Sequence, residues 1–317
     1  MKTISVVIPV YNEEENVYIA YERIRNLFED ELTQYSYEIV FIDNYSTDDT
    51  RHLVSEICKK DRNVKAIFNA KNFGFIRSTF YGLLQTCGDC TVLIFVDMQD
   101  PPEVICDFVR EWENGYKIVV GIKNKSKENH LMYFFRSVYY KLIKSMADIE
   151  HIEHFTGFGL YDKEFIQILN DLDDPMPYLR GIVAELGFQR KDIFYEQHKR
   201  ERGKSSFNFL KLYDLAMLGI TSYTKVIMRI ATILGFVFSA VSLIIALVTI
   251  VLKLFFWGSY PMGTAAILTG VFLIGSVQVF FIGFLGEYIL NINTRIMKRP
   301  LVIEEKRINF EDPEAGK

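Results

Sequence analysis

Residues 92–103 read VLIFVDMQDPPE, an apolar run that ends in Asp97 and continues to Asp100 and two prolines. A short apolar run without alternation predicts a strand that is covered on both faces, as in the centre of a parallel sheet. A carboxylate at the end of such a strand is held rigidly at the edge of the sheet. The stretch therefore predicts both a fold class and a side chain that faces a ligand.

Similar apolar runs occupy residues 4–10, 37–43, 64–68 and 117–121. Segments of helical length separate the runs, at residues 13–31, 48–60, 74–85 and 101–114. Two of these segments follow capping residues, and we expect Asp100 to cap the last one, with Pro101 in its first turn. The alternation of strands and helices predicts a doubly wound α/β domain with a mostly parallel sheet.

The composition excludes several classes of protein. The chain has 317 residues, of which 50% are apolar, so it is not a disordered polymer. Its net charge of -4 gives no basic field, and we expect no nucleic acid partner. A single Cys-x-x-Cys pair, Cys87 with Cys90, is typical of reduced structural cysteines rather than of a zinc or redox centre.

The composition changes near residue 229. Residues 230–252 and 263–286 carry no charge, and each run, at about 1.5 Å of helix per residue, is long enough to cross a hydrocarbon layer of about 30 Å. Basic residues flank the two runs on their outer sides, and the link between them carries only Lys253. This bias predicts a two-helix transmembrane hairpin with both ends in the cytoplasm, hence a multi-pass protein of the cell inner (plasma) membrane.

The segment before the first run, residues 205–228, gathers its apolar side chains broadly on one side of a helix. Such a segment is expected either to lie on the bilayer as an interfacial helix or to pack against the α/β domain. The expected parts are a cytoplasmic domain, a juxtamembrane helix, a hairpin and a cytoplasmic tail, at residues 1–204, 205–228, 229–290 and 291–317.

Polar side chains follow the predicted strands, and ligands of doubly wound sheets bind at this carboxyl edge. Neither a dinucleotide fingerprint nor a P-loop sequence occurs in the chain. Carboxylates beside an aromatic side chain instead suit a nucleotide whose base stacks on Tyr11 and donates to Asp43, and whose diphosphate reaches a metal at Asp97. Oxygen ligands such as the Asp97 carboxylate and the Gln99 amide favour Mg²⁺ or Mn²⁺.

A basic stretch, QHKRERGKSS at residues 197–206, precedes the segment expected at the membrane. Charge runs of this kind are usually solvated faces. Its position favours binding of a lipid phosphate, for which the donor fork of an arginine such as Arg200 is suited. Arg180 is a further candidate cation.

Taken in order, five segments and the paired C-terminal spans resemble the motifs of family 2 glycosyltransferases of the bacterial polyprenyl-phosphate type, similar in the catalytic domain to dolichyl-phosphate mannose synthase. The segments are PVYNEEEN (9–16), IDNYSTDDT (42–50), NFG (72–74), VDMQDPPE (96–103) and RERGKSS (200–206). The resemblance covers residues 3 to about 300 and implies a GT-A-like fold with an Mg²⁺ or Mn²⁺ ion.

The resemblance also implies roles for individual residues. Asp97 and Arg200 would be catalytic, and Asp97 and Gln99 would hold the metal. The nucleotide-sugar site would comprise Pro9, Tyr11, Asn12, Glu13, Asp43, Asn72, Gly74 and Asp97. The acceptor-phosphate site would comprise Lys123, Arg200, Arg202 and Ser205.

Two positions depart from the family pattern. Phe95 stands where the family usually has the first aspartate of Asp-x-Asp, and Gly157 stands where it usually has an acid proposed as the base. A phosphate monoester is mostly dianionic at neutral pH, because its second ionisation lies near pH 6, so an acceptor of that kind needs no strong base. Alternatively, activity has been lost.

We therefore expect a membrane-bound enzyme that moves a sugar from a nucleotide diphosphate sugar, preferably a UDP-sugar, to a polyprenyl phosphate at the cytoplasmic face, for cell-surface glycan assembly or modification. The resemblance further implies a homo-oligomer, a tetramer, with the tail LVIEEKRINF (301–310) available to pair with a neighbour. The alternatives are a catalytically silent, membrane-tethered nucleotide-sugar binder or scaffold, or a glycosyltransferase with another acceptor.

Overall fold

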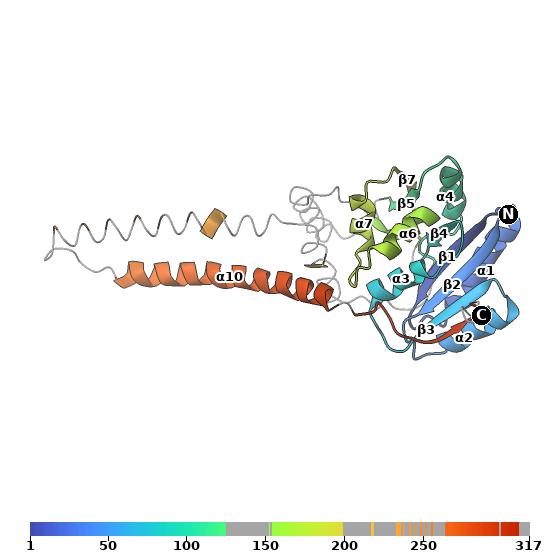
Figure 1. The fold of residues 1–317 in the computed structure, drawn as a ribbon, viewed down its shortest axis with the longest axis horizontal. Coiled ribbons are helices and arrows are strands. Elements are labelled where there is room, and N and C mark those ends of the chain that lie inside the picture. Colours follow the sequence, from blue (N-terminus) through green and yellow to red (C-terminus); the bar gives the residue numbers. More distant parts are fainter. Residues whose placement is uncertain are drawn as a thin grey trace.

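The computed structural model describes most of the α/β domain and part of the chain beyond that domain. The described residues are 1–124, 152, 154–198, 217–218, 264–297 and 299–310, with isolated positions between 233 and 255. An eight-stranded sheet flanked by helices forms the α/β domain, and a long helix, α10 (Thr264–Ile296), extends away from it (Figure 1).

One half of the sheet is the parallel, doubly wound part that the apolar runs predict. Its strands lie in the order β4-β1-β2-β3, and every neighbouring pair among them is parallel. The strands are β1 (Thr3–Val10), β2 (Ser36–Asp43), β3 (Val64–Asn69) and β4 (Cys90–Leu93). The helices are α1 (Val17–Asp30), α2 (Thr50–Lys60), α3 (Phe75–Leu84) and α4 (Val104–Glu113).

Both faces of this half are buried, which explains why its strands are apolar without alternation. In β1, Ile4, Val6 and Ile8 belong to the core on one face, whereas Val7 belongs to the core on the other. Successive side chains of a strand point to opposite faces, so a strand between two cores is largely apolar on both faces, and the one buried polar side chain of β1, Ser5, donates to Glu38.

The other half of the sheet is mixed, so the expectation of a mostly parallel sheet holds only in part. It contains β5 (Ile118–Lys123), β6 (Phe155–Asp162) and β7 (Arg190–Tyr195). Strand β6 lies between β4 and β5 and is antiparallel to both. Gly159 permits the close approach of β6 to β5, because a Cβ atom there would lie 2.6 Å from the carbonyl oxygen of Val119.

The start of α4 corrects one expectation. The N-cap of α4 is Glu103, and Asp100 lies earlier, almost completely buried. Asp100 is therefore not the helix cap that the sequence pattern suggested. Two further helices, α6 (Lys163–Asp171) and α7 (Leu179–Glu185), follow β6, and the Asp162 side chain caps α6 by accepting from the backbone N–H of Glu164 at 3.0 Å.

After α10 the chain returns to the sheet. Strand β8 (Glu304–Ile308) pairs antiparallel with β3 and covers that edge. The Asn309 side-chain amide donates to the carbonyl oxygens of Cys58 and Val64, each at 2.7 Å. The tail that we expected to pair with a neighbouring subunit thus pairs within its own chain. The expected tetramer stays a prediction.

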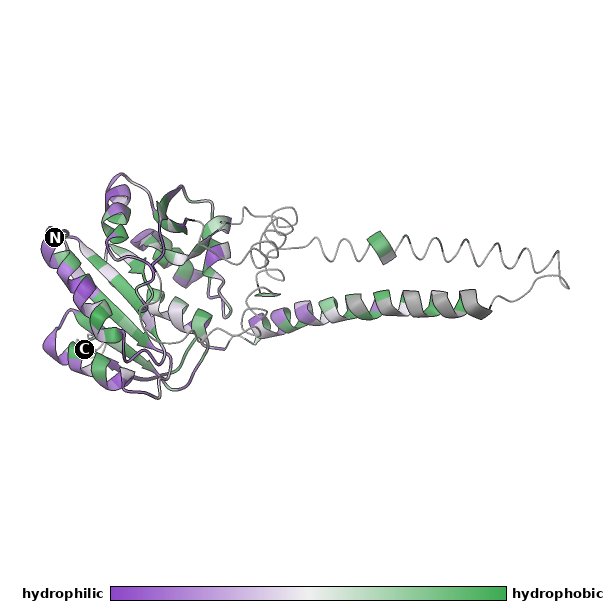
Figure 2. Cartoon of the chain, turned by 180° about the vertical axis from the view of Figure 1, so that it is seen from behind, coloured by the Kyte–Doolittle hydropathy of each residue, from purple (hydrophilic) through white to green (hydrophobic). Residues whose placement is uncertain are grey.

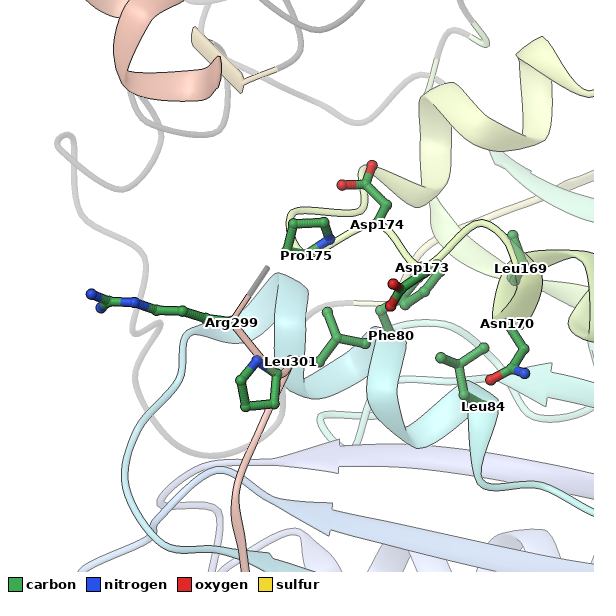
Figure 3. Close-up of a pocket in the computed structure, with 10 residues that line it drawn as sticks. Phe80, Leu84, Leu169, Asn170, Asp173, Asp174, Pro175, Arg299 and Leu301 are labelled. Atoms are coloured by element: carbon green, nitrogen blue, oxygen red, sulfur yellow. The ribbon is translucent and has the colours of Figure 1, made fainter. Parts of the chain in front are cut away.

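The base of α10 is attached to the α/β domain. Arg295 forms an ion pair of 2.9 Å with Asp174, in the loop between α6 and α7. A small cavity of about 120 Å³ lies beside this loop and the segment after α10 (Figure 3). None of the residues expected to bind substrate lines it. Its lining residues are Phe80, Leu84, Leu169, Asn170, Asp173, Asp174, Pro175, Arg299, Pro300 and Leu301.

Helix α10 changes in character along its length. The turns nearest the α/β domain are the most hydrophilic part of α10 (Figure 2), and large apolar side chains further out are exposed, Val271 by 64% and Val279 by 70%. Within the described part of the chain, no helix meets the length and apolarity required to cross a membrane. The second expected span, residues 263–286, falls almost entirely within α10, whereas the first expected span, residues 230–252, and the juxtamembrane helix lie largely outside the described residues.

Candidate functional site

The loops expected to bind substrate meet at one edge of the sheet. Val10 at the end of β1 pairs with Asp43 at the end of β2. On the other side of β1, the ladder with β4 continues past the strand, because the Ile94 N–H donates to the Val7 carbonyl oxygen at 3.1 Å. Neighbouring strands lie about 4.8 Å apart, so the segments that follow β2 and β4 flank the segment that follows β1.

The loops after β1 and β2 are interlocked by hydrogen bonds. The backbone N–H of Asn12 donates to Ser46 Oγ at 2.9 Å, and the Asn12 side-chain oxygen accepts from the backbone N–H of Thr47 at 2.8 Å. The Glu13 N–H donates to Thr50 Oγ1 at 2.9 Å. Asn12 has a φ of 53°, in the left-handed region that asparagine tolerates better than most residues. The two loops therefore form one rigid wall.

Asp43 is enclosed in this wall. Its side chain is 0% exposed and lies 3.2 Å from Arg51 Nε. Its oxygens accept from the backbone N–H groups of Tyr45 at 3.1 Å and Ser46 at 3.2 Å. Burial raises the pKa of the Asp43 carboxyl, whereas the hydrogen bonds at Ser46 and the charge of Arg51 act in the opposite direction. The carboxylate thus holds the loop, and its expected contact with a base stays a prediction.

The loop after β3 is joined to the same wall through Asn44. The Asn44 amide donates to Asn72 Oδ1 at 3.0 Å, and the Asn44 side-chain oxygen accepts from the backbone N–H of Phe73 at 2.9 Å. Asn72 Oδ1 also accepts from the Gly74 N–H at 2.9 Å. Gly74 has a φ of 89°, a conformation that favours glycine. Asn72 and Gly74 therefore shape the loop that begins α3.

Asp97 lies on a turn beyond the end of β4, and it is half-buried. The turn closes through the Met98 N–H, which donates to the Phe95 carbonyl oxygen at 3.3 Å, and Met98 has a φ of 49°. The Gln99 N–H donates to Asp97 Oδ1 at 3.3 Å. Unlike Asp43, Asp97 keeps part of its surface open to a ligand.

Lys123 ends β5 beside this turn. Its Nζ lies 3.6 Å from Asp100 Oδ1, and its side chain is 20% exposed. Burial lowers the pKa of the Lys123 ammonium, whereas the negative charges of Asp100 and Asp97 raise it. We expected Lys123 at the acceptor phosphate, and the structure pairs it with Asp100, three residues after Asp97, the residue expected to meet the donor diphosphate.

The remaining predicted residues divide into two groups. Pro9 lies in β1 beside Ile42 of β2, and Tyr11 follows β1 and is half-buried, so both belong to the same edge. The expected acceptor residues Arg200, Arg202 and Ser205 lie outside the described residues.

The two positions that depart from the family pattern lie next to each other. A Cβ atom on Gly157, which has a φ of 112°, would lie 3.8 Å from Phe95 Cζ and 3.4 Å from Leu93 Cδ2. The Phe95 ring also packs on Phe75, with 5.7 Å between the ring centroids. An aromatic ring therefore lies beside the position where the family usually has the proposed base.

The residues expected to hold a metal are few but of a suitable kind. No group of three or more His, Cys, Asp or Glu side chains that could hold an ion occurs among the residues that the structure describes. Asp97 and Gln99 are both half-buried and lie two residues apart on one turn. Mg²⁺ is commonly bound through one or two carboxylates together with substrate phosphates and water, so an Asp97 carboxylate with a Gln99 amide fits a metal that the substrate helps to bind.

The partners that support these loops were not predicted. Asp43 ends β2 and Arg51 lies in the first turn of α2, eight residues later, and this short separation is the only local signal for the pair. Tyr195 donates to Asp100 at 2.7 Å across 95 residues of chain, and no local pattern predicts such a pair.

Comparisons with known proteins decide the family. A family model described as glycosyl transferase family 2 matches residues 5–187. The chain belongs to glycosyl transferase family 2. The family predicted from the motifs is thereby confirmed, and the chain is a glycosyltransferase.

Relatives match this glycosyl transferase over nearly its whole length. An SfII prophage-derived bactoprenol glucosyl transferase of Shigella flexneri is 32% identical over 304 residues, which is 96% of this chain and 97% of the relative. An uncharacterized glycosyltransferase of Bacillus subtilis is 28% identical over 309 residues, which is 97% of this chain and 95% of the relative.

Among solved structures, a mannosyltransferase from Pyrobaculum calidifontis in complex with GDP-Man and Mn²⁺ aligns with a TM-score of 0.46 at 14% identity. The alignment covers 93% of this chain and 87% of that one.

Proposed function

We propose that this glycosyltransferase moves a sugar from a nucleotide diphosphate sugar, with UDP-glucose the first donor to test, to a polyprenyl phosphate at the cytoplasmic face of the cell membrane. The observation that carries the proposal is the half-buried Asp97 on a turn at the carboxyl edge of the sheet, beside the interlocked loops of Asn12 and Asp43. The lipid acceptor is supported by the bactoprenol glucosyl transferases among the relatives.

The wall of loops after β1, β2 and β3 suits the nucleoside of the donor. It is rigid, because its loops hydrogen-bond to each other, and a rigid wall loses little conformational entropy when a ligand binds. Tyr11 supplies an aromatic face at this edge. The nucleoside would lie against these loops and the diphosphate would extend toward Asp97.

The Asp97 turn suits the diphosphate end of the donor. A divalent ion held by Asp97 and Gln99 would neutralise charge on the leaving diphosphate. Lys123 supplies a positive charge beside the same turn, and Asp97 and Gln99 orient the diphosphate. These residues keep the anomeric carbon in a fixed position for attack.

A phosphate acceptor is consistent with the local chemistry at Phe95 and Gly157. A phosphate monoester oxygen attacks the anomeric carbon while the bond from that carbon to the diphosphate oxygen breaks. The attacking oxygen of a dianion carries no proton, so the reaction requires no general base at position 157. The ring of Phe95 beside Gly157 is compatible with such a reaction.

The membrane location is proposed from the sequence and from the exposed side chains of α10. Residues 230–252 and 263–286 carry no charge, and large apolar side chains of α10 are exposed. Extended apolar surface of this kind is typical of contact with lipid or protein. The proposed hairpin would hold the cleft near lipid headgroups, and the basic residues 197–206 would meet their phosphates.

Transfer to lipid is the test of this function. Full-length protein in detergent, with Mg²⁺ or Mn²⁺, would be given candidate nucleotide sugars with and without a short-chain polyprenyl phosphate. We expect release of nucleoside diphosphate that depends on the lipid, together with a lipid product that carries one additional hexose by mass spectrometry.

A control with a modified acceptor tests whether the phosphate of the lipid is required. The corresponding polyprenol, which lacks the phosphate, should accept no sugar. Transfer to the polyprenol or to water at an equal rate would contradict the proposed acceptor, and donor binding without transfer under all donors would favour the silent binder.

A further inference from the structure

Asp100 is a buried carboxylate at the meeting point of three parts of the sheet. It follows the Asp97 turn, it is 1% exposed, and it does not cap α4. A carboxylate removed from water in this way is unfavourable unless it is paired and hydrogen-bonded. The partners of Asp100 therefore indicate why the residue is there.

Three side chains converge on a single oxygen atom of Asp100. Tyr195 Oη donates to Asp100 Oδ1 at 2.7 Å, and Gln197 Nε2 donates to the same atom at 3.5 Å. Lys123 Nζ forms an ion pair with it at 3.6 Å. Lys123 comes from the end of β5 and Tyr195 from the end of β7, so Asp100 connects both strands to the segment after β4.

The structure makes room for the tyrosine that reaches Asp100. A Cβ atom on Gly121 of β5 would lie only 2.9 Å from Tyr195 Cε1, so the absence of a side chain lets the ring lie against β5. Phe158 packs edge-on against Tyr195, with 5.4 Å between centroids. Tyr195 is 5% exposed, and it has little freedom to turn away.

A backbone contact joins the same strand to the Asp97 turn. The His198 N–H, three residues beyond β7, donates to the Gln99 carbonyl oxygen at 2.9 Å. The Asn124 N–H, directly after Lys123, donates to the Tyr195 carbonyl oxygen at 2.9 Å. The ends of β5 and β7 and the turn therefore form one connected unit.

We propose that Asp100 is a positioning residue of the transfer site: its buried carboxylate, fixed by Tyr195, holds the Lys123 ammonium at the segment that follows the Asp97 turn, where the leaving diphosphate of a nucleotide sugar gains charge. This inference rests on the proposed function. A charge fixed before the reaction stabilises the transition state without reorganisation. A lysine without this anchor would spread over many rotamers, since its side chain is long and flexible.

The test is a double-mutant cycle on nucleotide binding, which needs no turnover. Calorimetry would measure the affinity of full-length protein for UDP and for GDP with Mg²⁺, in the wild type, in Asp100→Asn, in Lys123→Met and in the double variant. We expect each single substitution to weaken the better-bound nucleotide about tenfold. The double variant should be no more than about threefold weaker than either single variant, because Asp100 acts through Lys123.

Conservative variants separate positioning from general damage to the fold. Lys123→Arg should retain affinity within about threefold, because it keeps the charge. Tyr195→Phe, which removes only the hydroxyl, should weaken binding about threefold in the wild type and not measurably in Lys123→Met. Asp107→Asn, at an exposed carboxylate of α4 that pairs with Arg110, is the matched control and should change nothing.

Each outcome decides the inference. Independent effects that multiply to about a hundredfold in the double variant would overturn it, as would a wild type that binds neither nucleotide. Should Asp100→Asn fail to fold, the cycle of Tyr195→Phe with Lys123→Met gives the same decision. If the effects of Asp100→Asn and Lys123→Met on nucleotide binding are coupled but no sugar is transferred, the role of Asp100 stands and the proposed function is contradicted. If sugar is transferred but the two effects are independent, the proposed function stands and the role of Asp100 is contradicted.

Discussion

Asp43 ends the apolar strand β2 and Asp97 lies four residues beyond the apolar strand β4, at the same edge of the sheet, yet the surroundings of the two aspartates differ. Asp43 is 0% exposed and lies against Arg51, with two backbone N–H groups donating to it. Asp97 is half-buried, and the Gln99 N–H donates to it at 3.3 Å. The first carboxylate holds the protein together and the second is available to a ligand. An acid at the end of a buried strand therefore indicates the location of a site, while burial and partners indicate which acid meets the substrate.

The largest expected effect is on turnover. Asp97→Ala should lower the rate of transfer about a thousandfold, because it removes the carboxylate that would orient the diphosphate and its metal. The melting temperature should change little, since a half-buried acid with a long hydrogen bond contributes little to folding. Initial rates of nucleotide release and thermal melts would measure the two effects. A variant that keeps a tenth of the wild-type rate would remove Asp97 from the proposed site.

Asp43→Asn should show the opposite pattern. The amide nitrogen introduced in place of one carboxylate oxygen cannot accept from Arg51 or from the backbone donors, so the free energy of unfolding should fall by about 1–3 kcal/mol. Binding of nucleotide should weaken mainly through the distorted loop. Denaturant titration of full-length protein in detergent, with Asp97→Asn as the matched control, checks this. Equal free energies of unfolding for Asp43→Asn and Asp97→Asn would show that Asp43 contributes no more to folding than Asp97 does.

The pH dependence of stability sharpens the comparison further. Burial raises the pKa of Asp43 in the folded protein, so the folded state holds this proton more tightly than the unfolded chain does. The stability that this provides is present below the ordinary pKa of about 4 and is lost as pH rises through the folded pKa. The stability advantage of the wild type over Asp43→Asn should therefore shrink as pH rises above about 4. Unfolding midpoints of both proteins at several pH values would measure this advantage. An advantage that grows as pH rises would show that the pKa of Asp43 is lowered in the folded protein and not raised.

The smallest expected effect concerns the outer partner of Arg51. Arg51 also pairs with Glu305 of β8 at 2.8 Å, but the Glu305 side chain is 51% exposed. Ion pairs at such exposure contribute little, so Glu305→Gln should change the free energy of unfolding by less than about 0.5 kcal/mol and leave turnover unchanged. A loss of stability as large as that expected for Asp43→Asn would show that β8 fixes Arg51 and, through Asp43, the loop after β2.

The sequence predicted those parts of the fold in which each segment carries its own signal. The runs that became β1 to β4 are apolar because cores lie on both of their faces. Once these strands are placed, the segments of helical length between them are identified as α1, α2 and α3. Strand β6 was missed because Gly157 and Gly159 interrupt its aromatic residues and weaken its strand signal, and its place depends on close packing against β5. Strand β8, with the sequence EEKRI, is polar, and only its pairing with β3 makes it a strand.

The candidate site was predictable to a similar degree. Asp97 could be identified from the strand that it follows. Asp100 was interpreted as a helix cap, because an aspartate before a proline is typical of a helix start, whereas its actual partner Tyr195 lies 95 residues away. Contacts over such separations leave no pattern in the local sequence.

The position of β8 has a consequence for biosynthesis. The strand that covers β3 is encoded after α10. The whole amino-terminal domain therefore emerges from the ribosome before the last strand of its sheet has been synthesised. Until then β3 presents an open edge, which invites pairing with another nascent chain. A shortened gene that stops before residue 229 would leave that edge open permanently, and its product should aggregate through the exposed β3 edge, which β8 covers in the full-length chain.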